Sequence, residues 1–278
     1  MNDWAKMPVL RSYRHFGKER NMPAIDEFRA LHRPGKPLIL FNVWDAGSAR
    51  AVAQEGARAI ATGSYGVAGA QGFEDDESFP ITEVLSNARR IITATDLPVT
   101  VDFSAGYGDS PEAAGRSVTA VAALGAVGIN LEDQLPGENE LNPIPAQMKR
   151  LRAAADSGLF INARCDVFLD VPAEGHDAGR TAIAIDRARA YADAGASGFF
   201  IGFTADRRAI AAICEQSPIP VNALWTPLAE GGFASHAELA DLGVARISHG
   251  VRPWFAAMAW LRQAARAVHG GAAPPYDG

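Results

Sequence analysis

Acidic side chains stand at or just after the ends of short apolar runs in the sequence, a placement that favours metal or substrate chemistry. Asp45, Asp102, the pair Glu132-Asp133 and Asp166 occupy such positions. Carboxylates that converge on one opening repel one another, and a bound cation relieves the repulsion. Oxygen ligands without clustered His or Cys select Mg²⁺, or alternatively Mn²⁺, over Zn²⁺. The acids therefore predict a hard divalent metal, with one member of the Glu132-Asp133 pair only orienting the ligands.

A positive charge and a hydroxyl-bearing loop accompany these acids. Arg164 ends a later apolar run and offers a forked, permanently charged group that suits a carboxylate or a phosphonate. The loop Thr62-Gly63-Ser64-Tyr65-Gly66 can offer backbone N–H groups and a hydroxyl to the same anion. A metal site beside an anion site predicts a small 2-oxo or 2-hydroxy acid, because negative charge growing on its oxygen would fall beside the cation.

Simpler interpretations are open for individual residues. Asp45 begins the segment Asp45-Ala46-Gly47-Ser48 and has a suitable side chain to cap a helix. Arg164 could form a structural ion pair with Asp166. His249 could equally be a core imidazole or a loop residue, and Cys165 is expected to be a packed, unreactive thiol.

The periodicity of apolar residues predicts the strands and helices that position these side chains. Short apolar runs alternate with longer amphipathic stretches, the pattern of βα units around a parallel sheet. The eight runs are 38–43, 59–63, 99–103, 127–132, 160–164, 198–202, 220–224 and 245–248. Gly56, Gly125, Gly195 and Gly243 each follow a helix-like stretch and precede an even-numbered run. Eight units without a phosphate-binding glycine motif favour a (β/α)8 TIM barrel, an α/β fold, over an open doubly wound sheet.

Composition and charge exclude several classes of partner. The chain has 278 residues, 48% of them hydrophobic, and a formal net charge of -6. This balance, without a long run of either sign, argues against nucleic acid and against an anionic membrane surface. The two cysteines form no disulfide framework, and neither a signal peptide nor a membrane span is indicated. We expect a cytoplasmic protein that acts on a small carboxylate.

One domain accounts for most of the chain. We expect an N-terminal extension at 1–20, a single barrel domain at 21–269 and a flexible tail at 270–278. The barrel domain should begin with a helix that covers the bottom of the barrel. Segment 254–261 predicts a strongly apolar last helix, which packs either on its own barrel or on another subunit.

Four motifs give the chain a resemblance to a known superfamily. They are Asn42-Val43-Trp44-Asp45-Ala46-Gly47-Ser48-Ala49, Val101-Asp102-Phe103 with Gly106-Tyr107-Gly108, Gly128-Ile129-Asn130-Leu131-Glu132-Asp133-Gln134, and Asn162-Ala163-Arg164-Cys165-Asp166. In this register the chain resembles the isocitrate lyase and phosphoenolpyruvate mutase superfamily from about residue 28 to residue 262. The resemblance implies a (β/α)8 barrel and a homotetramer whose last helix is exchanged between subunits. It also implies Mg²⁺-dependent making or breaking of a C–C or P–C bond through an enolate-like intermediate.

The resemblance also implies roles for individual residues. Asp102 resembles the principal metal carboxylate, and Glu132 resembles a further one that acts partly through water. Substrate-binding positions are matched by Asp45, by Gly63, Ser64 and Tyr65 of the anion loop, by Arg164 at the substrate carboxylate, and by Asn222 of the seventh strand. Asp75 stands where members place a mobile catalytic aspartate over the site.

Two departures from the superfamily pattern bear on the reaction. Ser104 stands at a metal position where members often have a second acid, so one negative charge is missing there. Loop 135–141 lacks the lyase sequence Lys-Arg-Cys-Gly-His and the Lys and Asn-Ser of the phosphonate enzymes. Glu138 and a displaced Asn139 are then the polar groups that this loop would bring to the reaction as it closes.

These features leave three hypotheses for function. The first is a Mg²⁺-dependent lyase or decarboxylase that breaks or forms a C–C bond in a small 2-oxo or 2-hydroxy acid. The second is P–C chemistry on phosphonopyruvate, which the acidic loop disfavours because a phosphonate is doubly charged. The third is a barrel that has lost metal catalysis and binds a ligand or performs a metal-free reaction. An unrelated two-carboxylate glycosidase is the remaining alternative.

Overall fold

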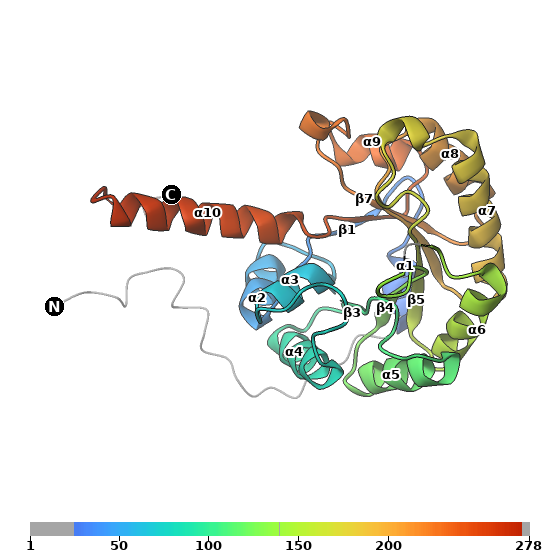
Figure 1. Cartoon of the computed structure of the whole chain (residues 1–278), viewed down its shortest axis with the longest axis horizontal. Coiled ribbons are helices and arrows are strands. Elements are labelled where there is room, and N and C mark those ends of the chain that lie inside the picture. Colours follow the sequence, from blue (N-terminus) through green and yellow to red (C-terminus); the bar gives the residue numbers. More distant parts are fainter. Residues whose placement is uncertain (1–24, 139, 274–278) are drawn as a thin grey trace.

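Eight parallel strands form a barrel in the computed structural model, which describes residues 25–138 and 140–273 (Figure 1). The strands are β1 (Leu38–Leu40), β2 (Ile60–Ala61), β3 (Val99–Asp102), β4 (Gly128–Glu132), β5 (Phe160–Cys165), β6 (Gly198–Ile201), β7 (Val221–Leu224) and β8 (Arg246–Ser248). They pair in the order β1-β8-β7-β6-β5-β4-β3-β2. A parallel bridge between Val43 and Thr62 joins the segments that directly follow β1 and β2. The predicted (β/α)8 barrel is confirmed, and every strand overlaps one of the eight predicted runs.

Helices alternate with the strands and surround the barrel. They are α1 (Ile25–Ala30), α2 (Ala46–Gln54), α3 (Ser64–Gly69), α4 (Ile81–Ala94), α5 (Pro111–Ala123), α6 (Ile144–Ala155), α7 (Ala178–Asp193), α8 (Arg207–Gln216), α9 (His236–Asp241) and α10 (Arg252–His269), with short 3-10 turns η3 (Ala173–Gly175) and η4 (Leu228–Glu230). Capping residues in the local sequence fix the first turn of several of these helices. Ser110 caps α5 by accepting the N–H of Ala113, and Asp177 caps α7 by accepting the N–H of Arg180. Such caps satisfy N–H groups that a helix cannot bond internally.

The apolar core has three parts, of which one gathers Ile210, Phe233 and Ile247. The other two show which end of the barrel is covered. The larger part lies between the strands and the surrounding helices and includes Val101, Ile129 and Ile161, all buried. The smaller part gathers residues from the beginnings of strands, and Phe28 of α1 packs there against Phe160 with ring centroids 5.4 Å apart. Helix α1 therefore covers the end of the barrel at which the strands begin, and the opposite end is left for a site.

The first turn of α10 is anchored on the barrel by one tryptophan. The ring of Trp254 lies edge-on to Trp44, with centroids 5.2 Å apart. It also lies over Gly66 and Gly69 of α3, where an added Cβ atom would come within 3.4 Å and 3.3 Å of Trp254. Small residues at these two positions therefore allow α10 to start against α3.

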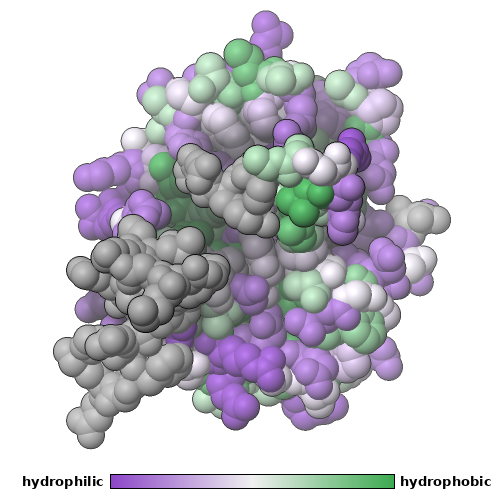
Figure 2. Space-filling model, turned by 90° about the vertical axis from the view of Figure 1, so that its left-hand side faces the viewer, coloured by the Kyte–Doolittle hydropathy of each residue, from purple (hydrophilic) through white to green (hydrophobic). Residues whose placement is uncertain are grey.

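Beyond this anchor α10 projects away from the barrel (Figure 1). Pro253 and Ala264 are its buried residues, whereas Phe255, Trp260 and Leu261 are about half exposed. Seen from the side of α10, apolar residues lie among polar ones on the surface (Figure 2). Most of the helix does not pack on its own barrel, and its exchange with another subunit stays a prediction.

The predicted extension at 1–20 and residues 274–278 of the predicted tail lie outside the described residues. Within the described ranges, no helix is long and apolar enough to cross a membrane.

Candidate active site

Asp102 lies at the C-terminal end of β3, where the barrel opens. Its Oδ2 accepts the backbone N–H of Ser64 at 3.1 Å, and its Oδ1 accepts the side-chain amide of Asn130 at 3.0 Å. Asn130 is itself oriented, because its Oδ1 accepts hydrogen bonds from Asn162 at 2.8 Å and from Arg246 at 3.1 Å. An amide whose oxygen is engaged in this way presents its NH₂ group on the other side. The carboxylate of Asp102 is therefore held in one direction.

Arg164 on β5 lies between two carboxylates. Its Nη1 donates to Oε1 of Glu132 at 2.6 Å, and its Nε donates to Oδ1 of Asp166 at 2.7 Å. Glu132 and Arg164 are direct partners in the register of β4 and β5, so strand pairing brings them together. The structure thus places Glu132 and Arg164 at the same rim as Asp102. It also forms the Arg164–Asp166 ion pair of the simpler interpretation.

Burial governs the charge balance of these groups. Burial raises the pKa of Glu132 well above its ordinary value, against the opposing effect of Arg164. The pKa of Asp166 is raised by burial as well, again against Arg164. Burial by itself would lower the pKa of Arg164, but the two carboxylates outweigh this effect and raise it. The guanidinium therefore stays charged, and both carboxylates depend on it for their ionised forms.

Asp75 reaches over the rim from the loop that follows α3. Its Oδ2 accepts the hydroxyl of Ser64 at 3.1 Å, while the backbone N–H of the same serine binds Asp102. Burial and the nearby charge of Asp102 raise the pKa of Asp75 to about 6. Because the residue is still partly open to solvent, it can exchange a proton near neutral pH at the entrance of the site.

A cavity of about 170 Å³ lies beside these groups. It is lined by the predicted residues Asp75, Ser104, Glu132 and Glu138 and also by Asp76, Glu77, Gln134, Leu135, Pro136, Asp166 and Leu169. Its volume is below the roughly 300–1,000 Å³ of pockets for drug-sized ligands, so it suits a small organic acid. The many carboxylates around it disfavour additional negative charges on that acid.

The residues of the predicted anion loop have different surroundings. Gly63 and Ser64 begin α3, and Ser64 contacts both acids described above. Tyr65 instead lies against Phe255 of α10, with ring centroids 5.1 Å apart, and is 41% exposed. The structure therefore brings Ser64, but not the ring of Tyr65, to the acids at the rim. Asn139 lies outside the described residues.

Two predicted substrate-binding residues have structural partners. Oδ1 of Asp45 accepts the backbone N–H and the hydroxyl of Ser48, at 2.7 Å and 2.8 Å, which is the helix cap of the simpler interpretation. Asn222 is buried on β7 and exchanges hydrogen bonds with Ser248 on β8. These contacts give both side chains partners within the chain, and the substrate-binding roles of Asp45 and Asn222 stay predictions. Cys165 is buried, and burial raises the pKa of its thiol well above the ordinary value, as expected for an unreactive cysteine.

Asp133 is the orienting member of the acidic pair. It is fully buried, and its Oδ2 accepts hydrogen bonds from Tyr191 at 2.6 Å and Arg187 at 3.0 Å. Its Oδ1 accepts the backbone N–H of Asp166 at 2.9 Å. Asp133 therefore holds the segment that carries Asp166 against Arg164, without facing the cavity itself.

Three further residues shape the site, although the sequence alone indicated no role for them. Asn130 orients Asp102, and Glu77 accepts the backbone N–H of Tyr107 at 3.2 Å. Burial raises the pKa of Tyr107, and the carboxylates of Glu77 and Asp75 raise it further. Asn130 and Tyr107 stand inside the motifs that identified the superfamily, so the sequence did mark their positions. Glu77 has no such signal, because its partner is 30 positions away in the chain.

The donor atoms at the rim fit a hard divalent cation. Each carboxylate oxygen of Asp102 accepts one hydrogen bond and keeps a lone pair, and Glu132 and Ser104 line the cavity of about 170 Å³. Mg²⁺ commonly takes one or two carboxylates and completes its shell with water and substrate. In the described ranges, no three His, Cys, Asp or Glu side chains converge as a ready-made metal cage. A cation here would therefore depend on water and on the bound acid for its remaining ligands.

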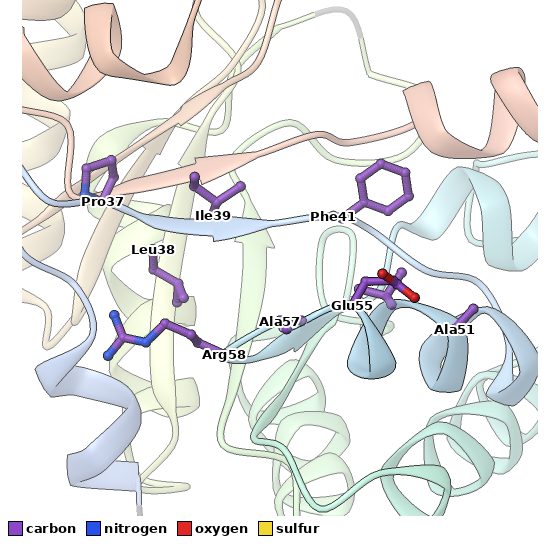
Figure 3. Close-up of a pocket in the computed structure, with 10 residues that line it drawn as sticks. Pro37, Leu38, Ile39, Phe41, Ala51, Glu55, Ala57 and Arg58 are labelled. Carbon is purple, nitrogen blue, oxygen red and sulfur yellow. The ribbon is translucent and has the colours of Figure 1, made fainter. Parts of the chain in front are cut away.

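A larger groove of about 620 Å³ lies along β1 and α2 (Figure 3). Ile39, Phe41 and Ala51 line it, together with the charged residues Glu55 and Arg58. The groove has no converging set of acids and cations that would orient a reacting carboxylate, so we do not regard it as the active site.

Comparisons with known proteins show the family of the chain. The family model described as phosphoenolpyruvate phosphomutase matches residues 28–269. A solved "putative phosphonomutase" from Burkholderia cenocepacia is 44% identical with a TM-score of 0.83, covering 89% of this chain and 98% of that chain. A 2-methylisocitrate lyase of Salmonella typhimurium is 33% identical over 185 residues, 62% of this chain and 60% of the lyase. An oxaloacetate decarboxylase of Rhodopseudomonas palustris is 31% identical over 196 residues, 70% of this chain and 67% of the decarboxylase.

Proposed function

Because the chain belongs to the phosphoenolpyruvate phosphomutase family, within the isocitrate lyase and phosphoenolpyruvate mutase superfamily, we propose a specific reaction class for it. The protein is a Mg²⁺-dependent lyase or decarboxylase that acts on a C–C bond of a small 2-oxo or 2-hydroxy acid. The observation that carries this proposal is the position of Asp102, Glu132 and Arg164 at one rim beside a cavity of about 170 Å³. Such a rim can hold a cation and a carboxylate side by side.

Arg164 is the group that binds the carboxylate of the substrate. Its Nε and Nη1 are engaged by Asp166 and Glu132, which leaves Nη2 to donate to an entering anion. The two carboxylates also hold the guanidinium in place before the substrate arrives, so less side-chain freedom is lost on binding. The Arg164 side chain is only 14% exposed, and its charge therefore acts with little screening by water.

Asp102, Glu132 and Ser104 are the residues that would hold Mg²⁺, or alternatively Mn²⁺. When bound, the cation supplies positive charge that stabilises the negative charge developing on a substrate oxygen as the C–C bond breaks. The protein's own contribution is orientation, because Asn130 and Ser64 hold the two oxygens of Asp102 in one direction.

Asp75 is the group that can hold or move a proton at this rim. A carbanion-like product must gain a proton after the C–C bond breaks, and loop 135–141 offers no cysteine for this purpose. The Asp75 carboxyl accepts a hydrogen bond from the Ser64 hydroxyl and lies near Asp102. Its pKa of about 6 allows it to be protonated part of the time near neutral pH. Leu135, Pro136 and Glu138 of the loop line the same cavity and would limit the access of water as the loop closes.

A second candidate function is P–C bond chemistry on phosphonopyruvate. The 44% identity to the Burkholderia cenocepacia structure favours it. The lining of the cavity opposes it, because Asp75, Asp76, Glu77 and Glu138 would lie around a doubly charged phosphonate. We therefore place C–C chemistry first.

Thermal unfolding with Mg²⁺ and oxalate tests the proposed site, because oxalate mimics the enolate of a 2-oxo acid. We expect the two ligands together to stabilise the protein by about 2.7 kcal/mol at 100 times the dissociation constant. Asp102→Ala should abolish this stabilisation. Asp96→Ala, which changes an exposed aspartate just before β3, should retain it. A wild-type protein that responds to neither ligand would contradict the proposal.

A product assay then separates the two reaction classes. Pyruvate release from oxaloacetate or a substituted malate, but not from phosphonopyruvate, is the result expected for C–C chemistry. Release from phosphonopyruvate alone would favour the second candidate.

We also propose that the protein is a homo-oligomer in which α10 packs on a neighbouring subunit. The half-exposed Phe255, Trp260 and Leu261 of α10 and the half-exposed Ile39 and Phe41 of the groove along β1 are complementary apolar surfaces. Burial of both surfaces in an assembly would remove them from water. Sedimentation of the full chain and of a variant that ends at residue 251 tests this, since only the full chain should assemble.

A further inference from the structure

Three strained residues meet at one place beside the site. Glu77, Ser104 and Tyr107 have positive φ angles of 61°, 46° and 51°, although none of them is glycine. Such conformations persist only where surrounding contacts hold them, and they occur preferentially at functional sites. Glu77 belongs to the strap 72–78, whereas Ser104 and Tyr107 bound the turn that follows β3. The strain therefore marks the junction between the strap and this turn.

Glu77 makes the junction with its side chain. Its Oε1 accepts the backbone N–H of Tyr107 at 3.2 Å. Burial raises the pKa of Glu77, and the backbone N–H groups of Tyr107, Ala105 and Gly106 oppose that rise. A carboxylate facing several backbone N–H groups is a strong acceptor, because each of these hydrogen bonds is assisted by its charge. The strap is thus attached to the turn by one side chain.

The turn itself is rigidly held from the helices behind it. Nη2 of Arg150, on α6, donates to the carbonyl oxygens of Ala105 at 2.5 Å and Gly108 at 3.0 Å. The hydroxyl of Ser117, on α5, donates to the carbonyl oxygen of Tyr107 at 3.0 Å. The anchor point for Glu77 is therefore part of the barrel framework.

The second attachment of the strap is Asp75, two residues before Glu77. Asp75 accepts the hydroxyl of Ser64, and the backbone N–H of Ser64 binds Asp102. The two attachments flank Asp102, one at the start of α3 and the other on the turn that follows β3. Between them, Asp76 accepts the backbone N–H of Ser78 at 2.9 Å, a contact within the strap itself.

We propose that Glu77 is a positioning residue, whose carboxylate clamps the strap 72–78 to the turn 104–107 and thereby holds Asp75 over Asp102. The catalytic consequence of the clamp rests on the proposed function, but the clamp itself does not. The uncharged Ser104 is part of the arrangement, because an acid at this position would add a further negative charge to a cavity lining that already holds Glu77 and other carboxylates. The serine that departs from the superfamily pattern and the clamp therefore belong together.

Hydrogen exchange of the full-length protein without ligands tests the clamp directly. Glu77→Ala should raise the exchange rate of the Tyr107 amide and of the strap amides at least tenfold. Glu77→Gln should raise it less, because the amide oxygen still accepts the Tyr107 N–H. Asp76→Ala removes a neighbouring charge and should change exchange only near Ser78. Wild-type exchange in Glu77→Ala at residues 105–107 and in the strap would overturn the proposal.

Turnover of the acid identified in the product assay tests the consequence for Asp75. Glu77→Ala should lower kcat at least tenfold, and in the Asp75→Asn background it should cause no further loss, because both changes remove the same positioned group. Fully additive losses would show that Glu77 does not act through Asp75 and would overturn the positioning role. If exchange reveals the clamp but no acid is turned over, the proposed function fails while the clamp stands.

Discussion

Glu132 and Asp133 are neighbours in the sequence, yet they belong to two different groups of charges. Glu132 joins Arg164 and Asp166 in the mouth cluster, whose two carboxylates line the cavity. Asp133 joins Arg187 and Tyr191 in the sealed cluster on the other side of β4. The separation follows from strand geometry, because successive side chains point to opposite faces.

The two clusters differ in how their carboxylates are satisfied. Both oxygens of Asp133 accept hydrogen bonds from donors of the chain. In the mouth cluster, Oδ2 of Asp166 is buried without a hydrogen-bond partner among the described residues, and burial raises the pKa of Glu132. Incompletely paired carboxylates beside a cavity are characteristic of functional sites, whereas carboxylates paired at both oxygens away from a cavity hold a fold together. From this comparison we propose a chemical role for Glu132 and a stabilising role for Asp133.

The largest expected effect comes from Asp133→Asn. The substitution would replace one carboxylate oxygen by an NH₂ group, which would then face the donor group of Arg187, Tyr191 or the Asp166 backbone. The buried guanidinium of Arg187 would also lose its counter-charge. We expect a loss of about 3–5 kcal/mol in the free energy of unfolding, measured by urea denaturation. Asp193→Asn, at the exposed end of the same helix α7, is the control and should change little. A loss below about 1 kcal/mol for Asp133→Asn would remove the distinction between the clusters.

Glu132→Gln also replaces a carboxylate by an amide, but it should weaken ligand binding rather than the stability of the fold. The amide oxygen can still accept from Arg164, so the free energy of unfolding without ligands should change by less than about 1 kcal/mol. The negative charge offered to the cation is lost, so Mg²⁺ and oxalate should bind at least about tenfold more weakly. Isothermal titration calorimetry measures the binding. An unchanged affinity for Mg²⁺ and oxalate would mean that Glu132, like Asp133, has a structural role.

The mouth cluster should also show a pH dependence through Asp75. Its pKa is raised to about 6 by burial and by Asp102, while Ser64 and Arg164 lower it and Asp76 raises it slightly. A carboxyl with a raised pKa binds its proton more tightly in the folded state. Its contribution to stability is therefore full below its ordinary pKa of about 4 and is lost as the pH rises through about 6.

Thermal unfolding of the wild type and of Asp75→Asn between pH 4 and pH 7 measures this contribution. The stability of the wild type relative to the variant should fall across this range and then level off. A difference that rises with pH would mean that the folded state prefers the ionised form of Asp75. The solvent access of this residue makes the effect smaller than that of Asp133→Asn.

The smallest effect is expected on the exposed face of α7. Arg189 lies two residues after Arg187 and pairs with Asp186 at 3.7 Å, with both side chains more than half exposed. Arg189→Ala should therefore cost less than about 1 kcal/mol in urea denaturation. A larger loss of stability would contradict the inference that the exposed Arg189 contributes less to the fold than the buried Arg187.

Much of the fold could be predicted because its signals are local. The eight apolar runs match the strands, since β propensity and burial depend on residues within a few positions. The cap at Asp45 was one of two open interpretations, because Ser48 lies only three residues away. In parallel strands, the register places residues at matching ends beside one another, so Glu132 and Arg164 could also be expected at one rim.

Other features could not be predicted, because they join distant segments. Arg187 and Tyr191 reach Asp133 across 54 and 58 positions, and no local pattern marks such a pairing. Tyr65 stands in a motif-like loop, yet α10 determines where its ring lies.

By itself, the sequence determined the order of strands and helices, the superfamily, and the set of acids at the strand ends, because these depend on residue type and short-range spacing. Only the tertiary structure decided which acid faces the cavity, that Glu77 is attached to the turn after β3, and that α10 leaves the barrel. Those outcomes depend on side-chain contacts between segments that meet only after the barrel has closed.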